Sequence, residues 1–286
     1  MKVTFFLLVS LCVIFDRAYA QDSSQVDNHL LFLSTFDDTT DVNLFGPDND
    51  AGWIYTAEST KRTRVLLDNR CPEVSIAKDD GKIGDCLRFA EKTKDVLFYQ
   101  ASPNLASPRR NWSGTVSFWL KPDLENLGTE NCYPIQLSDG DWNHGGFFVR
   151  FRGESPSTFE FGTVSGGDAA QAVHCPNGVT EDLRFVAAIE TIKFAKDKWT
   201  MVTFTFENVN PDGHDTSVAK AYLNGDLVGQ IRQPLHIQWM DPDNLKAEQN
   251  AAVFIGINYI GSVDDLRMYD RALSEPRIQM LYKMAK

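Results

Sequence analysis

The sequence lacks two features that would connect it to membranes or nucleic acids. After its first twenty residues it has no apolar run near the roughly 20 residues that a membrane-spanning helix needs. It also has no cluster of basic residues, and its formal net charge of −11 repels both nucleic acid and anionic lipid. We therefore expect no membrane insertion and no nucleic-acid partner.

Patterns that mark common enzyme classes are missing as well. The chain contains no phosphate-binding loop and no dinucleotide fingerprint. Its five histidines are scattered through chain ends and predicted loops, without the glycine pattern that surrounds a hydrolase nucleophile. The sequence therefore gives no positive indication of a nucleotide-dependent enzyme or of a triad hydrolase.

The first twenty residues are typical of an export signal. Lys2 gives a positive start, an apolar stretch runs from Phe5 to Phe15, and Ala18-Tyr19-Ala20 offers a small-x-small cleavage site. The alternative is an uncleaved membrane anchor, but this stretch is shorter than the roughly 20 residues that a spanning helix needs. We expect cleavage after residue 20 and a secreted, extracellular mature chain of residues 21–286.

Cysteine is scarce, with five residues in the chain. Removal of the signal takes Cys12 away and leaves an even set, Cys71, Cys86, Cys132 and Cys175, in a compartment that permits disulfides. Three pairings are possible, and we favour the local one, which joins Cys71 to Cys86 and Cys132 to Cys175. A four-cysteine zinc site is the alternative, but no pair has the short spacing that such sites use.

Apolar residues recur with a period of two along most of the chain. Val116, Phe118 and Leu120 share one face of an extended strand in this way. Further strands are expected at residues 30–36, 86–89, 96–99, 147–151, 159–161, 184–189, 202–206, 218–223, 253–257 and 262–269. No helical segment lies between them, so a parallel sheet would lack its crossovers. The pattern predicts one all-β domain, residues 21–286, with two packed antiparallel sheets.

Two local signals are stronger than the rest. Asn224-Gly225 between two strand patterns predicts a tight hairpin, because both central residues of a type I′ turn need positive φ. Near the end of the chain, Ser274 can cap a helix and Pro276 suits its first turn. The apolar face of this short C-terminal helix is expected to comprise Ile278, Leu281 and Tyr282.

The segment from Ile260 to Glu275, IGSVDDLRMYDRALSE, resembles the closing motif of laminin-G-like jelly rolls in the concanavalin A-like lectin/glucanase superfamily. Other segments agree with this family in order: 31–37, 81–84 before 87–89, 114–121, 198–204 and 221–225. The resemblance implies a two-sheet antiparallel jelly-roll sandwich whose members mostly bind glycans or proteins. The chain departs from the family in two insertions, residues 165–181 and 233–250, which leaves any inherited ligand site open.

The resemblance also implies one structural calcium ion where the first and last strands meet. The matching positions are Asp37 and Asp265, whose oxygens suit a hard cation. Asp264 is the less favoured ligand of the neighbouring pair. In the alternative, Asp37 is a turn residue, and Asp264 or Asp265 is hydrogen-bonded to the backbone or to Arg267.

The loop from Ser138 to Gly146 is the candidate ligand site, because it joins two strands and combines an aromatic ring with polar groups. A tryptophan can stack on a sugar ring while carboxylates and amides bind its hydroxyls. The candidate ligand-binding residues are Asp139, Asp141, Trp142, Asn143 and His144. In the alternative, the loop is a glycine-dependent turn and Trp142 packs on the sheet.

Enzymes of the same superfamily carry a Glu-x-Asp-x-x-Glu array, which this sequence lacks. We therefore expect a secreted module that binds a carbohydrate or a glycoprotein, with calcium ordering the scaffold. The alternatives are a carbohydrate-active enzyme and a structural or adhesive protein. Asn111-Trp112-Ser113 matches the glycosylation acceptor pattern, so Asn111 is a candidate modification site. The sequence leaves the ligand and the oligomeric state open.

Overall fold

The computed structural model describes residues 28–41, 55–58, 61–64, 71–93, 96–101, 104–105, 110–139, 145–152, 155–165, 184–189, 194–195, 197–212, 215–237 and 251–285. Contacts divide the chain into a unit that ends at Leu30 and a unit from Leu31 to Lys286. The predicted signal, residues 1–20, and most of the candidate ligand loop lie outside the described residues.

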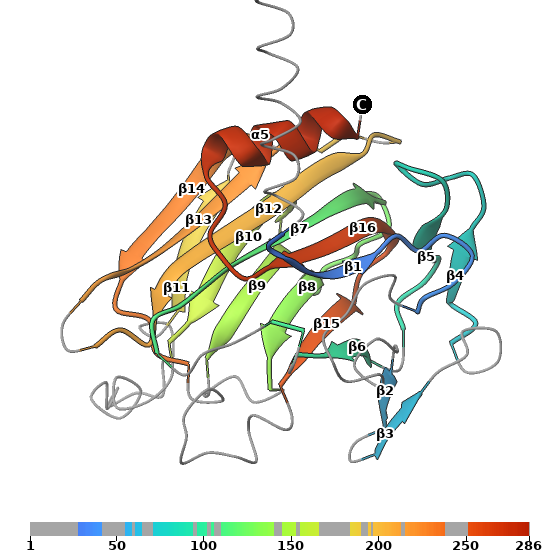
Figure 1. The fold of residues 1–286 in the computed structure, drawn as a ribbon. Helices are drawn as coiled ribbons and strands as arrows, with labels where there is room; N and C mark the ends of the chain where they lie inside the picture. The colour runs from blue at the N-terminus through green and yellow to red at the C-terminus, as the bar shows by residue number, and fades with distance from the viewer. Residues whose placement is uncertain are drawn as a thin grey trace, which may run out of the picture. The chain divides into compact units, whose positions relative to one another are not determined.

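The first sheet, here called sheet A, has the strand order β14-β13-β12-β7-β16-β5-β4, and β1 also pairs with β16 (Figure 1). Its strands are β1 (Leu30–Ser34), β4 (Val74–Ala77), β5 (Cys86–Phe89), β7 (Trp112–Pro122), β12 (Thr200–Val209), β13 (Ser217–Leu223), β14 (Asp226–Gln233) and β16 (Gly261–Tyr269). Neighbours along the main path run antiparallel.

The second sheet, sheet B, has the order β11-β10-β9-β8-β15-β6-β2-β3, again antiparallel. Its strands are β2 (Tyr55–Glu58), β3 (Lys61–Arg64), β6 (Val96–Gln100), β8 (Cys132–Ser138), β9 (Gly146–Arg152), β10 (Ser155–Val164), β11 (Arg184–Ile189) and β15 (Ala252–Ile257). The helix α5 (Glu275–Met284) follows β16. The predicted all-β, two-sheet antiparallel jelly-roll sandwich with a short C-terminal helix is confirmed.

The inner faces of the two sheets form one aromatic core. Phe147 of sheet B is fully buried, and its ring lies 4.7 Å from Phe206 and 6.2 Å from Phe204, both of sheet A. Trp112 begins β7 and is fully buried, with its ring 4.2 Å from that of Phe206. Because side chains alternate along a strand, each core residue leaves its neighbours pointing outward.

The predicted hairpin and helix are both present. Asn224 and Gly225 join β13 to β14 with φ of 53° and 88°, as a turn with two left-handed residues requires. α5 begins after Ser274, with proline in its first turn. Tyr282 of α5 stacks on the ring of Trp119, an outward residue of β7, at 5.8 Å. The helix therefore lies against the outer face of sheet A (Figure 1).

The favoured disulfide between Cys71 and Cys86 is not formed. The pairs Val74 with Phe89 and Ala77 with Cys86 define the β4–β5 hairpin, and the carbonyl of Cys71 accepts a hydrogen bond from the Val74 nitrogen. Cys71 thus stays at the Val74 end, while three residues of strand, about 10 Å, separate that end from Cys86. A disulfide needs Cα atoms within about 7 Å. The Cys86 and Cys132 thiols are free and buried, and Cys175 lies outside the described residues.

Replacing the central core ring should destabilise the fold strongly. We expect Phe147→Ala to lower the free energy of unfolding by about 3–5 kcal/mol, because it removes a fully buried ring and leaves a cavity. Denaturant unfolding of the mature chain measures the change. Leu227→Ala is the control, since Leu227 is 45% exposed and its loss should change stability by less than about 0.5 kcal/mol. Equal effects for the two variants would contradict this core.

Candidate functional site

Three features of the described surface are candidate functional sites. The first, here called the acidic corner, lies beside β1 and β16 and comprises Asp37 and Asp264. Asp37 follows β1, and its Oδ1 accepts a hydrogen bond from the Asp85 nitrogen at 2.9 Å. Asp264 lies in β16, and its Oδ2 accepts from the Lys82 nitrogen at 2.7 Å and the Ile83 nitrogen at 3.0 Å. The loop from Gly81 to Asp85 therefore joins Asp37 to Asp264.

Asp264 is the more unusual of the two carboxyl groups. Its side chain is fully buried, and Oδ1 has no hydrogen-bond partner. Burial raises its pKa to about 7, although the two loop nitrogens oppose that shift by favouring the charged form. A buried carboxylate oxygen without a partner is costly unless a proton or a cation satisfies it.

Asp265, the expected calcium ligand, has a different partner. A β-bulge interrupts the pairing of β16 with β7 between Asp264 and Arg267, and Asp265 has a φ of 50°. Its Oδ2 accepts a hydrogen bond from Arg267 Nε at 2.9 Å, as the alternative interpretation anticipated. The contacts of the described residues bring Asp264, rather than Asp265, to the loop that Asp37 binds.

Asp37 and Asp264 suit a calcium ion by the type of their donor atoms, but they provide few side-chain ligands. The unpartnered, buried Asp264 oxygen and the Asp37 carboxylate are hard oxygen donors of the kind that calcium prefers. Within the described ranges, however, no three His, Cys, Asp or Glu side chains gather closely enough to hold a metal. An ion at this corner would therefore take its remaining ligands from backbone carbonyls and water, which calcium accepts.

The second feature is a recess on the outer face of sheet B, here called the aromatic recess. Its volume is about 200 Å³, and its lining comprises Tyr133, Gln136, Leu137, Ser138, Gly145, Gly146, Phe147, Phe148, Val164 and Ile257. Tyr133 and Phe148 meet edge to face at 5.9 Å. Gln136 pairs with Phe148 across β8 and β9, so an amide lies beside the two rings.

The aromatic recess adjoins the loop that the sequence singled out. Ser138, Gly145 and Gly146 are the described ends of that loop, and all three line the recess. Asp139 is half-buried just beyond β8. The other candidate ligand residues, Asp141, Trp142, Asn143 and His144, lie outside the described residues.

A buried ion pair supports one wall of the aromatic recess. Arg150 Nε donates to Glu160 Oε2 at 2.6 Å, and the two side chains are 9% and 5% exposed. The guanidinium also reaches the Tyr133 hydroxyl at 3.5 Å and lies 5.2 Å from the centre of the Phe148 ring. Arg150 thus contacts both aromatic walls and restrains them.

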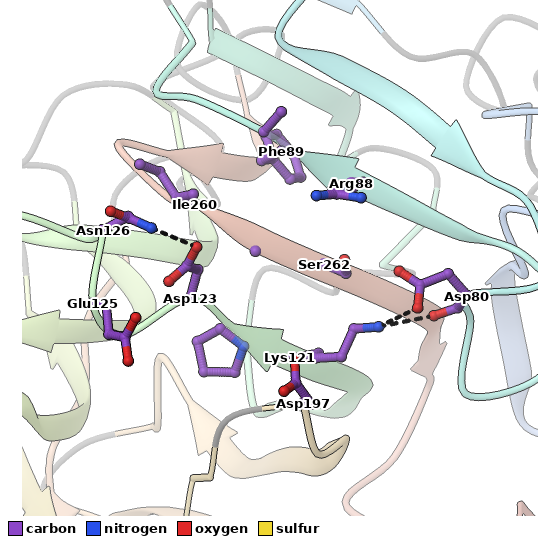
Figure 2. Close-up of a pocket in the computed structure, with 13 residues that line it drawn as sticks. Asp80, Arg88, Phe89, Lys121, Asp123, Glu125, Asn126, Asp197, Ile260 and Ser262 are labelled. Carbon is purple, nitrogen blue, oxygen red and sulfur yellow. Dashed lines mark hydrogen bonds and ion pairs between the residues drawn. The ribbon is translucent and has the colours of Figure 1, made fainter.

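The third feature is a larger hollow on the outer face of sheet A, here called the polar cavity. Its volume is about 330 Å³ (Figure 2). Charged and hydrogen-bonding side chains form most of its wall: Asp80, Arg88, Lys121, Asp123, Glu125, Asn126, Asp197 and Ser262. Figure 2 shows Asp123 and Glu125 on one side of the hollow and the Lys121–Asp80 ion pair on the other.

Asn111, the candidate glycosylation site, is exposed and has a φ of 53°. Its Nδ2 donates a hydrogen bond to Asp212 Oδ2 at 3.2 Å. Arg110 and Asn111 both contact Asp212 and lower its pKa. The asparagine is therefore reachable from solvent, and its modification stays a prediction.

Comparison with known proteins identifies the family. A laminin-G-type family model, described as the concanavalin A-like lectin/glucanases superfamily, matches residues 99–279. The chain belongs to this superfamily, and the resemblance seen in the sequence is confirmed. No curated protein matches the sequence.

Several solved structures are similar in fold. Domain 4 of AbnA, an extracellular GH43 arabinanase from Geobacillus stearothermophilus, solved with arabinotriose, matches with a TM-score of 0.50 and 15% identity over 89% of this chain and 99% of that one. The binding domain of Paraclostridial mosquitocidal protein 1 gives 0.48 and 14% over 81% and 51%. The receptor-binding domain of botulinum neurotoxin D gives 0.47 and 12% over 81% and 52%. This chain spans about half the length of the two toxin domains.

Sequence reasoning missed the polar cavity and the importance of Asp264. Arg88 and Lys121 occupy outward positions that alternate with core residues, so the strand pattern marked them as exposed but did not bring them together. Their shared neighbour Ser262 is far away in the sequence.

Among the described residues no helix has the length and apolar character to cross a membrane.

With no cation bound, Asp264 should make the protein less stable as pH rises. Its pKa in the folded protein, about 7, is above its ordinary value of 3.8, so the folded state binds the proton more tightly and loses that advantage between about pH 4 and pH 7. At pH 8 with chelator present, we expect the free energy of unfolding of Asp264→Asn to be about 2–4 kcal/mol higher than that of the unmodified chain. At pH 4 the difference should nearly vanish.

Urea unfolding at pH 4, 6 and 8 measures this difference, because other titrating groups contribute equally to both proteins. Asp226→Asn, at an exposed position of β14, is the matched control and should change little at any pH. A loss of stability in Asp264→Asn at pH 8 would show that the carboxylate has a compensating partner in the folded protein.

Proposed function

We propose that this protein is a secreted carbohydrate-recognition module that binds a sugar chain at the aromatic recess of sheet B. The observation that carries the proposal is the recess itself, where the rings of Tyr133 and Phe148 stand beside Gln136 and Ser138. Sugar sites combine an apolar wall with a few placed polar groups, and this recess has both. Its position at the base of the loop 138–146 allows that loop to add further contacts.

The chemistry of the recess suits a hydroxyl-rich ligand better than a purely apolar one. The C–H face of a sugar ring can pack on the half-buried Tyr133 ring, while the Gln136 amide both donates and accepts hydrogen bonds. Arg150 holds the Tyr133 hydroxyl and lies over Phe148, so the wall is preorganised before the ligand arrives. A restrained wall loses little entropy on binding.

Binding without turnover is the proposed activity. The buried carboxylate near the recess is Glu160, and its Oε2 is bound by the Arg150 guanidinium. A retaining glycosidase needs two carboxyl groups about 5–5.5 Å apart, one of which must exchange a proton. Glu160 is committed to this ion pair, and no aspartate or glutamate is among the described residues that line the recess. The arabinanase domain solved with arabinotriose shares only the fold at 15% identity, but it makes arabinotriose a sensible first probe.

We also propose one structural calcium ion at the acidic corner, held by Asp37 and Asp264 in place of the expected pair Asp37 and Asp265. Support comes from the unpartnered Asp264 Oδ1 and from the common loop that both carboxylates bind. Phe36 and Asp38 flank Asp37 with φ of 57° and 62°, and such backbone strain in a bulky residue often marks a constrained site. The ion would supply the positive charge that the buried carboxylate lacks.

Tyr133→Ala should weaken sugar binding by about threefold to tenfold, because it removes one stacking wall. Isothermal titration calorimetry with arabinotriose and with neutral hexose oligosaccharides measures the change. Tyr133→Phe keeps the ring and should bind within about twofold of the unmodified chain. Tyr282→Ala, in helix α5 on the outer face of sheet A, should leave the affinity unchanged. Unaltered binding in Tyr133→Ala, with its fold intact, would remove the recess from consideration.

Calcium should raise the melting temperature of the unmodified chain by about 5 °C or more at saturation, because a ligand that binds only the folded state stabilises it. This gain should be lost in Asp37→Asn and in Asp264→Asn, and it should persist in Asp265→Asn and in the control Asp226→Asn. Differential scanning calorimetry with calcium and with chelator measures it. A gain that persists in Asp264→Asn and disappears in Asp265→Asn would restore the expected ligand pair.

A further inference from the structure

We propose that the polar cavity of sheet A is a second saccharide site, selective for hydroxyl-rich ligands that carry no negative charge (Figure 2). The proposal takes the ligand class, carbohydrate, from the proposed function. It places a separate site, of different chemistry, on the other sheet. The register of three strands, the volume of the cavity and the charges that line it support this second site.

The register of sheet A builds one wall of the cavity. Ser262 of β16 pairs with Arg88 of β5 on one side and with Lys121 of β7 on the other. The residues next to them, Leu87, Leu120 and Val263, are fully buried in the core. The three polar side chains therefore form one outward row across three neighbouring strands. Such a row is rigid, because each residue belongs to a strand paired on both sides.

The floor of the cavity depends on a glycine. Gly261 has a φ of 140°, and a Cβ at this position would lie 2.6 Å from the Lys121 carbonyl oxygen and 2.6 Å from the Tyr259 hydroxyl. Only glycine keeps the backbone in this conformation without a clash. At about 330 Å³, the volume is at the small end of the range of ligand pockets, which is about 300–1,000 Å³, and suits one or two sugar rings.

The cavity offers both donors and acceptors to a ligand. Arg88 is exposed, and its five N–H groups have no hydrogen-bond or ion-pair partner among the described residues. Across the hollow, the carboxylates of Asp123 and Asp197 can accept hydrogen bonds from hydroxyl groups (Figure 2). Asp123 already accepts one from Asn126 Nδ2 at 2.8 Å, which fixes its orientation. Sugar hydroxyls can satisfy both kinds of group at once.

The charges select against anionic ligands. Lys121 Nζ is bound to Asp80 Oδ1 at 2.6 Å, so this pair is neutral as a unit. The remaining charged side chains of the wall are one cation, Arg88, and three carboxylates, Asp123, Glu125 and Asp197. One positive and three negative charges leave a formal balance of −2, which repels uronate or sulfate groups. A neutral sugar meets no such penalty.

The two sites lie on the outer faces of different sheets, since the side chains of each alternate with core residues of its own sheet. One short oligosaccharide therefore cannot occupy both. We expect two independent binding events per chain, and for a long polysaccharide we expect avidity from two sites. Backbone amide spectra can follow the two events separately, through Ser262 and Lys121 for the polar cavity and through Gln136 and Phe148 for the aromatic recess.

The experiment is an NMR titration of the mature chain with arabinotriose, with a neutral hexose trisaccharide and with trigalacturonate as the anionic probe. We expect the neutral probes to shift both sets of amides in the unmodified chain. In Arg88→Ala, the affinity obtained from the shifts at Ser262 and Lys121 should fall by tenfold or more. The affinity obtained from the shift at Gln136 should stay unchanged. Tyr133→Ala should do the reverse. Thermal unfolding confirms that each variant is folded, and Lys220→Ala is a control at an outward position of β13 away from the cavity.

The outcomes separate the two proposals. Shifts at the recess alone, unaffected by Arg88→Ala, would overturn the second site and leave the proposed function standing. Shifts at the polar cavity alone would support the second site and overturn the recess. Absence of shifts with every neutral probe would overturn both. Tighter binding of trigalacturonate than of the neutral trisaccharide at Ser262 would overturn the charge selectivity, whereas Asp197→Asn should improve trigalacturonate binding about threefold.

Discussion

The packing of two inner sheet faces against each other, centred on Phe147 and its aromatic neighbours, is the constraint on which the rest of the structure depends. Since alternate residues of each strand must fill this core, the residues between them are placed outward in a fixed register. Arg88, Ser262 and Lys121 form their row for this reason, and Phe148 stands beside Gln136 for the same reason. Both proposed binding surfaces are thus consequences of core packing, with loops and one terminal helix added.

One buried group, the Asp264 carboxyl, is left by this packing with an oxygen that has no hydrogen-bond partner. Asp264 takes two backbone hydrogen bonds from the loop between β4 and β5, yet its second oxygen lies buried without a partner. The same loop binds Asp37 and therefore links the first strand to the last. Satisfying Asp264 with a cation would stabilise the closure of the sheet near the chain ends and, at neutral pH, would remove the conflict between burial and charge. We therefore propose that the acidic corner orders the scaffold and that sugars bind on the outer faces of the sheets.

The sequence predicts the local parts of this fold well, because the period of two, the Asn224-Gly225 turn and the terminal helix each depend on neighbouring residues, although the Ser274 side chain makes no capping hydrogen bond. It fails where distant strands must be aligned. The row through Ser262 can be predicted only when the register of β5, β7 and β16 is known. A bulge in β16 brings Asp264, rather than Asp265, to the loop that Asp37 binds, and the alternation of side chains does not reveal a bulge. The predicted disulfide between Cys71 and Cys86 relied on their closeness in the sequence and was wrong, because the register of the β4–β5 hairpin puts the two cysteines at opposite ends of the hairpin. Of the candidate ligand loop, the structure describes Ser138, Asp139, Gly145 and Gly146.

The most direct test of the account is a crystal structure of residues 21–286 grown with calcium and soaked with a neutral oligosaccharide. The account predicts a sugar ring packed on Tyr133 and hydrogen-bonded to Gln136, over a sandwich whose core is unchanged. Sugar density confined to surfaces away from both the aromatic recess and the polar cavity would contradict it. So would a Tyr133 ring turned into the core, because the outward alternation of side chains is the basis of both the aromatic recess and the polar cavity.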